Sequence, residues 1–79
     1  MQNFIKDYIS YNEFRIILLN NRINIVNYDE ILEINENNIS VRTNNKKIRI
    51  IGSNLVLSKL LEREILITGE LSKIEVEYV

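Results

Sequence analysis

Apolar residues that alternate with polar ones are the feature of this sequence that most restricts its fold. Branched apolar residues recur at every second position in short runs, and turn-forming residues separate the runs at intervals of roughly 7 to 10 positions. A spacing of two places these side chains on one face of a strand. The pattern therefore predicts an all-β fold, an antiparallel meander, small β-sandwich or roll of about seven to eight short strands. The pairs that define the runs are Ile16/Leu18, Ile23/Ile25, Leu32/Ile34, Ile39/Val41, Ile48/Ile50, Leu55/Leu57, Ile65/Ile67 and Ile74/Val76.

The segments between these runs predict hairpins in one consistent register. Asparagine tolerates the left-handed backbone of tight turns, and Asn44-Asn45 and Asn20-Asn21 each separate two alternating runs. Gly52-Ser53-Asn54 predicts a further turn. The expected cross-strand pairs are Val41 with Ile48, Ile39 with Ile50 and Arg42 with Lys47 about 44–45; Leu18 with Ile23 and Ile16 with Ile25 about 20–21; Ile34 with Ile39 and Leu32 with Val41 about 35–38; and Ile67 with Ile74 and Ile65 with Val76 about 69–72.

These registers also predict the hydrophobic core of a single domain spanning residues 1–79. The β core covers 13–79, and apolar residues at helical spacing within 1–12 are compatible with a short amphipathic helix. The predicted core consists of Ile16, Leu18, Ile23, Ile25, Leu32, Ile34, Ile39, Val41, Ile48, Ile50, Leu57, Ile65, Ile67, Ile74 and Val76.

The first expected strand is apolar on both faces, because Ile17 and Leu19 alternate with Ile16 and Leu18. Strands with this pattern are usually covered on both sides. Either the N-terminal segment or another subunit could cover the second face. The candidate interface residues are therefore Ile17, Leu19, Phe4 and Tyr8.

Composition argues against several classes of active site. The 79 residues include no Cys and no His, which removes thiolate chemistry, the commonest general base and the commonest metal ligands. Neither a phosphate-binding glycine loop nor a calcium loop is present, so we expect no enzyme activity, metal, cofactor or small-molecule substrate. The N-terminus lacks a continuous apolar run typical of a signal peptide, and we expect a cytoplasmic protein.

Carboxylates are numerous in the last third of the chain. A pair of them at a defined separation is what glycoside hydrolysis requires. Glu75 and Glu77, however, alternate with apolar residues and are expected on the solvent face of a strand. In the hairpin expected about 69–72, Glu64 lies opposite Glu77 as an exposed like-charge pair.

A basic cluster, Arg42, Lys46, Lys47 and Arg49, surrounds the turn at 44–45. It predicts either a solvated face or a patch for an anionic partner, such as lipid headgroups or an acidic protein surface. Nucleic acid is not expected, because the formal net charge is −1 and no aromatic residue is interleaved with the cluster.

Short strand motifs follow one another in a defined order and spacing from residue 22 to residue 78. The motifs are Ile23-Asn24-Ile25-Val26-Asn27-Tyr28, then Ile31, Leu32 and Ile34, then Asn38-Ile39-Ser40-Val41, Ile48-Arg49-Ile50-Ile51-Gly52, Leu55-Val56-Leu57 with Leu60, Ile65-Leu66-Ile67-Thr68-Gly69-Glu70-Leu71 and Ile74-Glu75-Val76-Glu77-Tyr78. In this order and spacing the chain resembles the YabP/YqfC family of sporulation proteins, and the segment before Arg22 is more similar to the YqfC branch.

The resemblance implies a small protein of spore-forming Firmicutes, made in the mother cell and connected with cortex and coat formation. The family has no associated enzymatic activity. Two hypotheses follow. The first is an assembly protein that binds other sporulation proteins or its own copies. The second is a membrane-peripheral adaptor that docks through Phe4, Ile5, Tyr8 and Ile9 together with the basic cluster.

Overall fold

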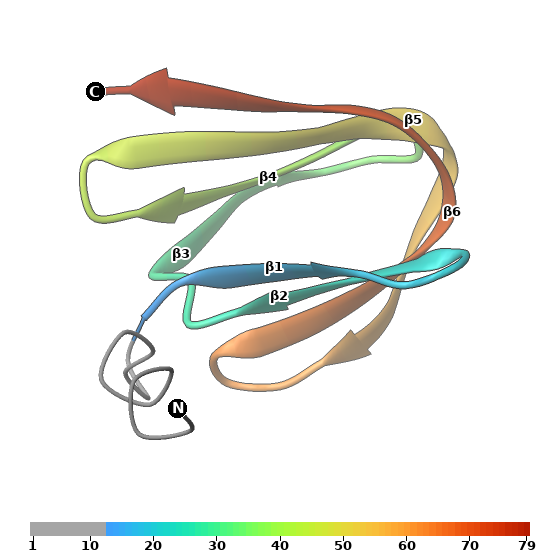
Figure 1. The fold of residues 1–79 in the computed structure, drawn as a ribbon, viewed down its shortest axis with the longest axis horizontal. Coiled ribbons are helices and arrows are strands. Elements are labelled where there is room, and N and C mark those ends of the chain that lie inside the picture. The colour runs from blue at the N-terminus through green and yellow to red at the C-terminus, as the bar shows by residue number, and fades with distance from the viewer. Residues whose placement is uncertain (1–12) are drawn as a thin grey trace, which may run out of the picture.

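Six antiparallel strands in one sheet make up the fold of residues 13–79. The computed structural model describes residues 13–79, which contain no helix, and the strand order is β1-β2-β6-β5-β4-β3 (Figure 1). The all-β prediction is therefore confirmed, whereas the helix expected within 1–12 lies outside the described residues. The strands are β1 Arg15–Leu18, β2 Arg22–Val26, β3 Glu30–Ile34, β4 Asn38–Thr43, β5 Lys46–Leu60 and β6 Glu64–Tyr78.

Two long strands, β5 and β6, run through both halves of the molecule. Each has 15 residues, and together they bend so that the sheet folds over on itself (Figure 1). One layer contains β3, β4, the first half of β5 and the second half of β6. The other contains β1, β2, the first half of β6 and the second half of β5. The two layers of the roll thus belong to one continuous sheet.

The bend of β5 and β6 coincides with irregular pairing between them. The register shifts between Ile51 and Gly52 and again between Ser53 and Val56. Asn54 has a left-handed backbone, with φ of 54°, and Gly69 on the facing strand has φ of 127°. Such residues and bulges bend a strand without ending it.

The core lies between the two layers. Ile23, Ile25, Ile65 and Ile67 come from one layer, and Ile39, Val41, Ile48 and Ile50 come from the other. Tyr28 and Leu55 complete the set of buried hydrophobic residues in the described chain. Each layer contributes alternate residues of its strands, as expected for sheets packed face to face.

The hairpins with short asparagine turns form as predicted. Val41 faces Ile48 and Ile39 faces Ile50 about the turn at 44–45, where Asn44 is left-handed with φ of 51°. Leu18 likewise faces Ile23, and Ile16 faces Ile25. Turn chemistry and the apolar pattern agree at both sites, which explains the accurate register.

Three predicted pairings are wrong. Ile34 faces Ile39 as expected, but a bulge between Ile31 and Glu33 places Ile31, rather than Leu32, opposite Val41. The hairpin about 69–72 does not exist, because β6 continues through it. Ile65 and Ile67 pair with Ile25 and Ile23 of β2, while Ile74 and Val76 pair with Ile50 and Ile48 of β5.

The predicted turn at 52–54 is also wrong, because these residues lie inside β5. Two long strands thus replace four short ones, and the described chain has six strands rather than seven or eight. Four predicted core residues, Leu18, Leu32, Ile34 and Val76, are exposed. Tyr28 and Leu55 are buried although they were not predicted.

Candidate functional site

The roll is open between β1 and the second half of β6. β2 pairs with β6 only over residues 64–68, so residues 73–78 of β6 pair with β5 alone. β1 is the last strand of the sheet and pairs only with β2. Within residues 13–79, both strands that border this gap therefore have an unpaired edge (Figure 1). We call the gap the open seam.

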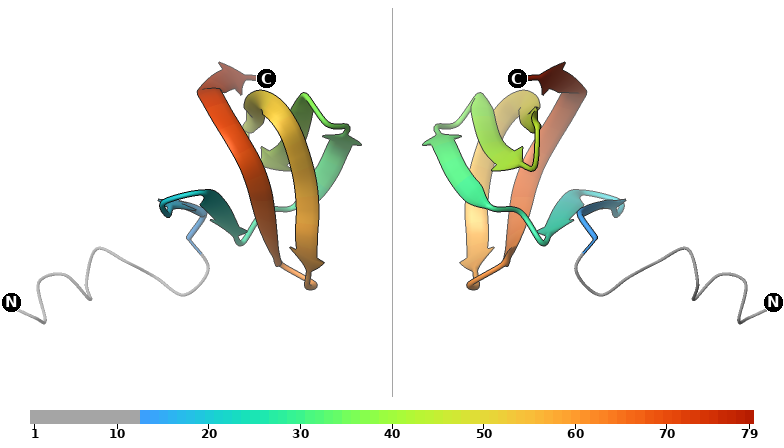
Figure 2. Two further views of the ribbon diagram at one scale, coloured as in Figure 1. Left: turned by 90° about the vertical axis from the view of Figure 1, so that its right-hand side faces the viewer. Right: turned by 90° about the vertical axis from the view of Figure 1, so that its left-hand side faces the viewer.

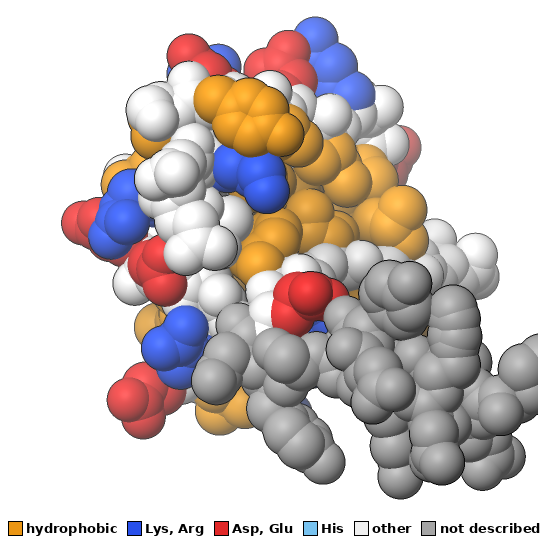
Figure 3. Space-filling model, turned by 60° about the vertical axis from the view of Figure 1, so that its left-hand side comes forward, with side chains coloured by type: hydrophobic (Ala, Val, Ile, Leu, Met, Phe, Trp, Pro, Cys, Tyr) orange, Lys and Arg blue, Asp and Glu red, His pale blue; other side chains and the backbone are white. Residues whose placement is uncertain are grey.

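Apolar side chains that point toward the core are exposed in the open seam. Leu18 lies opposite buried Ile23, on the core-facing side of the sheet, yet 58% of its surface is accessible. Val76 lies opposite buried Ile48 and is 55% accessible. Their exposure results from the missing neighbour on the edge side and not from an outward orientation. Figure 3 shows a continuous apolar area on this side of the molecule.

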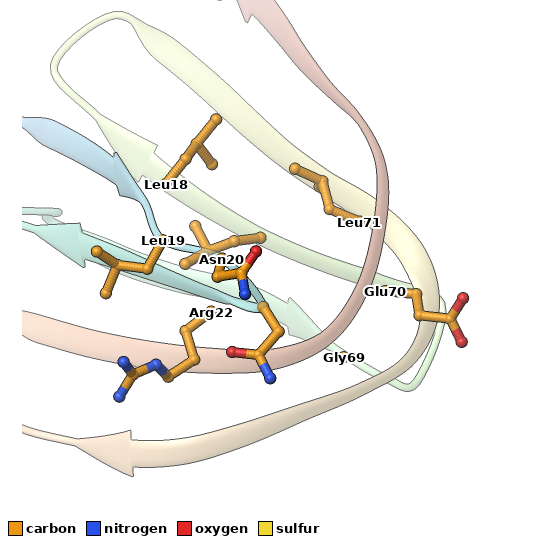
Figure 4. Close-up of a pocket in the computed structure, with 9 residues that line it drawn as sticks. Leu18, Leu19, Asn20, Arg22, Gly69, Glu70 and Leu71 are labelled. Carbon is orange, nitrogen blue, oxygen red and sulfur yellow. The ribbon is translucent and has the colours of Figure 1, made fainter.

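A pocket of about 420 Å³ lies at one end of the open seam. Leu18 and Leu71 enter the gap from β1 and β6, and the side chain of Glu70 points away from it (Figure 4). The remaining wall comes from the β1–β2 turn and from β6. The lining residues are Leu18, Leu19, Asn20, Asn21, Arg22, Ile23, Gly69, Glu70 and Leu71. Its leucines suit an apolar side chain from a binding partner.

Tyr78 lies at the other end of the second half of β6. It faces Lys46 across the β5–β6 pair, and the Lys46 Nζ lies 5.7 Å from the centre of the Tyr78 ring. Tyr78 shares the strand face of Val76 and is exposed. An exposed aromatic ring next to an unpaired edge is typical of a contact surface.

Charged residues occupy the opposite face of the same strand segment. Lys73, Glu75 and Glu77 alternate with Ile74 and Val76. The Lys73 Nζ lies 3.3 Å from a Glu75 carboxylate oxygen, and Arg49 lies 3.7 Å from Glu75 and 3.6 Å from Glu77. Charge on an edge strand limits indiscriminate pairing and restricts which partners fit.

The predicted basic cluster is largely neutralised by carboxylates. Arg42 Nε donates a hydrogen bond of 3.1 Å to Glu30, and Arg49 lies between two glutamates. Lys47 faces Glu77 across the strand pair. Lys46 lies on the other face of β5, against Tyr78. The four residues therefore do not form one cationic patch, and their arrangement gives no support to membrane docking.

The structure separates the predicted interface residues. Ile17 shares a face with Asn24 and Leu66, on the outer side of the sheet and away from the core. Leu19 lines the pocket at the end of the open seam. Both are exposed. Phe4 and Tyr8 lie outside the described residues.

The predicted Glu64–Glu77 pair does not form. Glu64 faces Val26 of β2 and accepts a hydrogen bond of 2.9 Å from the Asn24 amide, whereas Glu77 faces Lys47. The expectation failed because it depended on the hairpin about 69–72. Among residues 13–79, no three acidic side chains gather in a way that would hold a metal ion.

Comparison with protein families, with curated proteins and with solved structures found no match to this chain. The similarity to sporulation proteins therefore stays a prediction from the sequence. In the described part of the chain, no helix is long and apolar enough to cross a membrane.

Sequence reasoning missed the open seam because alternation alone cannot tell a covered strand from an uncovered one. Leu18 and Val76 follow the core-facing pattern and were assigned to the core. The signal that distinguishes β6 is its run of charges at Lys73, Glu75 and Glu77, which is typical of an edge strand. The earlier part of β6, from Ile65 to Ile67, has only an uncharged residue between its isoleucines.

Proposed function

We propose that this chain is a non-enzymatic assembly protein that acts by binding another protein at the open seam, and that it serves bacterial spore formation. Binding at the open seam is supported by one observation: an unpaired strand edge lies next to apolar side chains that face the core and yet are exposed. Leu18, Leu71 and Val76 all contribute to that surface. Together these features suit an added strand, whose backbone bonds to the edge and whose apolar side chains enter the roll.

The spore-forming role rests on the motif order between residues 22 and 78. The fold is compatible with it, since the matching segments form β2 to β6. The partner is another protein of the assembly or a further copy of this chain. A protein partner accounts for the geometry better than a membrane, because the arginines of the basic cluster already contact carboxylates.

Deletion and complementation in the native host test this function. Cells lacking the gene should produce fewer heat-resistant spores, and the unaltered gene should restore them. A double variant, Leu18→Asp with Val76→Asp, places charge on the open seam at two exposed positions and should fail to restore spores. The matched control, Leu32→Asp with Ile34→Asp, places the same charge on two exposed residues of β3 and should complement.

Two results would overturn the proposal. Normal spore numbers in the deletion strain would remove the link to spore formation. Full complementation by the open-seam variant would remove the seam from the function. Soluble expression and an unchanged circular dichroism spectrum must be established for both variants, so that a loss of function is not a loss of folding.

A further inference from the structure

The second half of β6 is an edge whose charge pattern is complementary to itself. We propose that its occupant is a second copy of this chain, paired antiparallel about a two-fold axis that lies within residues 73–78. This inference rests on the proposed function, because it names the partner of the same surface. The pairing would join the outer layers of two rolls into one longer sheet.

The edge is suited to such pairing by its length and its access. Among residues 13–79, the segment 73–78 pairs with β5 on one side only, and a strand of this length extends for about 20 Å. Alternate residues of a strand point their N–H and C=O groups to opposite sides, so half of these residues direct theirs to the free edge. Figure 2 shows this part of β6 at the margin of the roll, with β5 on one side and no described strand on the other.

Symmetry restricts the register to a few choices. Residues directly opposite in an antiparallel pair share a face, so Ile74 and Val76 must oppose residues that face the core, and Lys73, Glu75 and Glu77 must oppose residues that face outward. The two-fold axis must therefore pass through a residue position. The candidate positions within the segment are Ile74, Glu75 and Val76.

Charge selects among these positions. An axis at Ile74 places Lys73 opposite Glu75 of the second copy, and this contact occurs twice. An axis at Glu75 places Lys73 opposite Glu77 twice but brings the two Glu75 side chains together, and an axis at Val76 places Glu75 opposite Glu77 twice. Like charges directly opposite are unfavourable and unlike charges are favourable. The register centred on Ile74 is the only one of the three with unlike pairs and no glutamate pair.

This pairing also explains the apolar exposure of the open seam. Val76 and Ile74 would gain a neighbouring strand at the free edge of β6, and the second copy would approach Leu18 across the gap. The contact is small compared with the roughly 1,600 Å² of a standard interface. We therefore expect a reversible dimer that dissociates in the micromolar range.

Sedimentation equilibrium of the full chain over a wide concentration series tests the dimer. The unaltered protein should shift from monomer to dimer. Lys73→Glu should weaken the dimer about ten-fold or more, since it replaces both unlike contacts with like ones. The double variant Lys73→Glu with Glu75→Lys exchanges the two charges and should restore dimerisation. Lys59→Glu, the same change at an exposed position on β5, is the matched control and should leave the dimer unchanged.

Hydrogen exchange locates the contact. Backbone amides in 73–78 should exchange more slowly at high protein concentration than at low concentration, whereas those of β3 should not change. Protection of 73–78 that is independent of concentration in a monomer would show that another part of the same chain covers the edge, and would overturn the proposal. A dimer dissociation constant that Lys73→Glu leaves unchanged would also overturn the proposal. So would a failure of the charge-exchange variant to restore dimerisation.

The outcome is separable from that of the spore experiment. A strictly monomeric protein whose open-seam variant still fails to complement would disprove self-pairing and keep the seam as the site for a different protein. A dimer whose open-seam variant complements fully would keep self-pairing and remove the seam from the proposed function.

Discussion

Gly52 of β5 and Gly69 of β6 each face the other strand's backbone where a side chain would begin. A methyl group on Gly52 would coincide with the Glu70 carbonyl oxygen, and one on Gly69 would lie 2.5 Å from the Asn54 carbonyl oxygen. The backbones of the two strands therefore leave no room for a side chain at these two positions, where both strands bend. Because the layers of the roll are joined through this bend, the two glycines position the open seam relative to the core.

Alanine at Gly69 should destabilise the fold. The backbone φ of 127° is unfavourable for any residue with a side chain, and the new methyl group would meet the backbone of Asn54 and Leu55. We expect a loss of about 1–3 kcal/mol from the conformation, with the close contact adding to it. Chemical denaturation should show a lower midpoint, whereas the control Ser53→Ala, at an exposed neighbouring position, should change it little. Equal midpoints for Gly69→Ala and Ser53→Ala would contradict the close approach of the strands.

The loss of unfolding free energy when an isoleucine is replaced by alanine should depend on how deeply its side chain is buried and not on its place in the alternating pattern. Ile50 is fully buried and Ile34 is 50% exposed, although both follow the core-facing pattern. Ile50→Ala should lower the free energy of unfolding by about 2–5 kcal/mol, enough to unfold much of a marginally stable domain. Ile34→Ala should cost clearly less, because its side chain leaves less of a cavity. Thermal unfolding of both variants gives the comparison, and an equal loss would mean that β3 is covered in solution.

The sequence predicted the strand pairing correctly where a short asparagine turn joins the two strands, and incorrectly where the paired residues are far apart in sequence. The turns at Asn20-Asn21 and Asn44-Asn45 join neighbouring strands, so turn chemistry and pattern over a few residues determined their registers. The pairing of Ile65 with Ile25 links residues distant in sequence, and no local pattern specifies it. Gly52, Asn54 and Gly69 were interpreted as turns because the same residues allow a turn or a bend within a strand.

Prediction of the candidate site was limited for the same reason. The sequence identified the charged face of β6 and the apolar alternation beneath it. Whether Val76 is core or surface depends on whether a strand lies beside β6, which is a property of the strand order. Tyr28 was also missed, because its burial depends on a contact with residues near position 61 rather than on its own strand pattern.

Removal of the Tyr28 hydroxyl should lower the free energy of unfolding less than removal of the whole ring. The hydroxyl donates a hydrogen bond of 3.2 Å to the Leu61 carbonyl oxygen, and the side chain is buried against the core. Tyr28→Phe should lower stability by about 0.5–1.5 kcal/mol, the usual net value of one hydrogen bond. Tyr28→Leu, which also leaves a cavity, should cost more. Urea denaturation of the two variants measures the difference, and a neutral Tyr28→Leu would mean that the ring is not part of the core.

Ser40 should be one of the few buried positions at which alanine is neutral or stabilising. Its side chain is fully buried between Glu33 and Arg49 on the neighbouring strands, and its hydroxyl has no hydrogen-bond partner among the described residues. A buried polar group without a partner is unfavourable, so Ser40→Ala should raise the free energy of unfolding by up to about 1 kcal/mol.

The matched control for Ser40 is Ser58→Ala. The Ser58 hydroxyl lies 2.8 Å from the Thr68 hydroxyl on an exposed part of β5 and β6, so the same substitution there removes a hydrogen bond. Both changes replace serine by alanine in a strand, and their difference in β propensity is therefore similar. Thermal unfolding should place Ser40→Ala at or above the melting temperature of the unaltered protein and Ser58→Ala slightly below it. The reverse order would show that the Ser40 hydroxyl is hydrogen-bonded in solution.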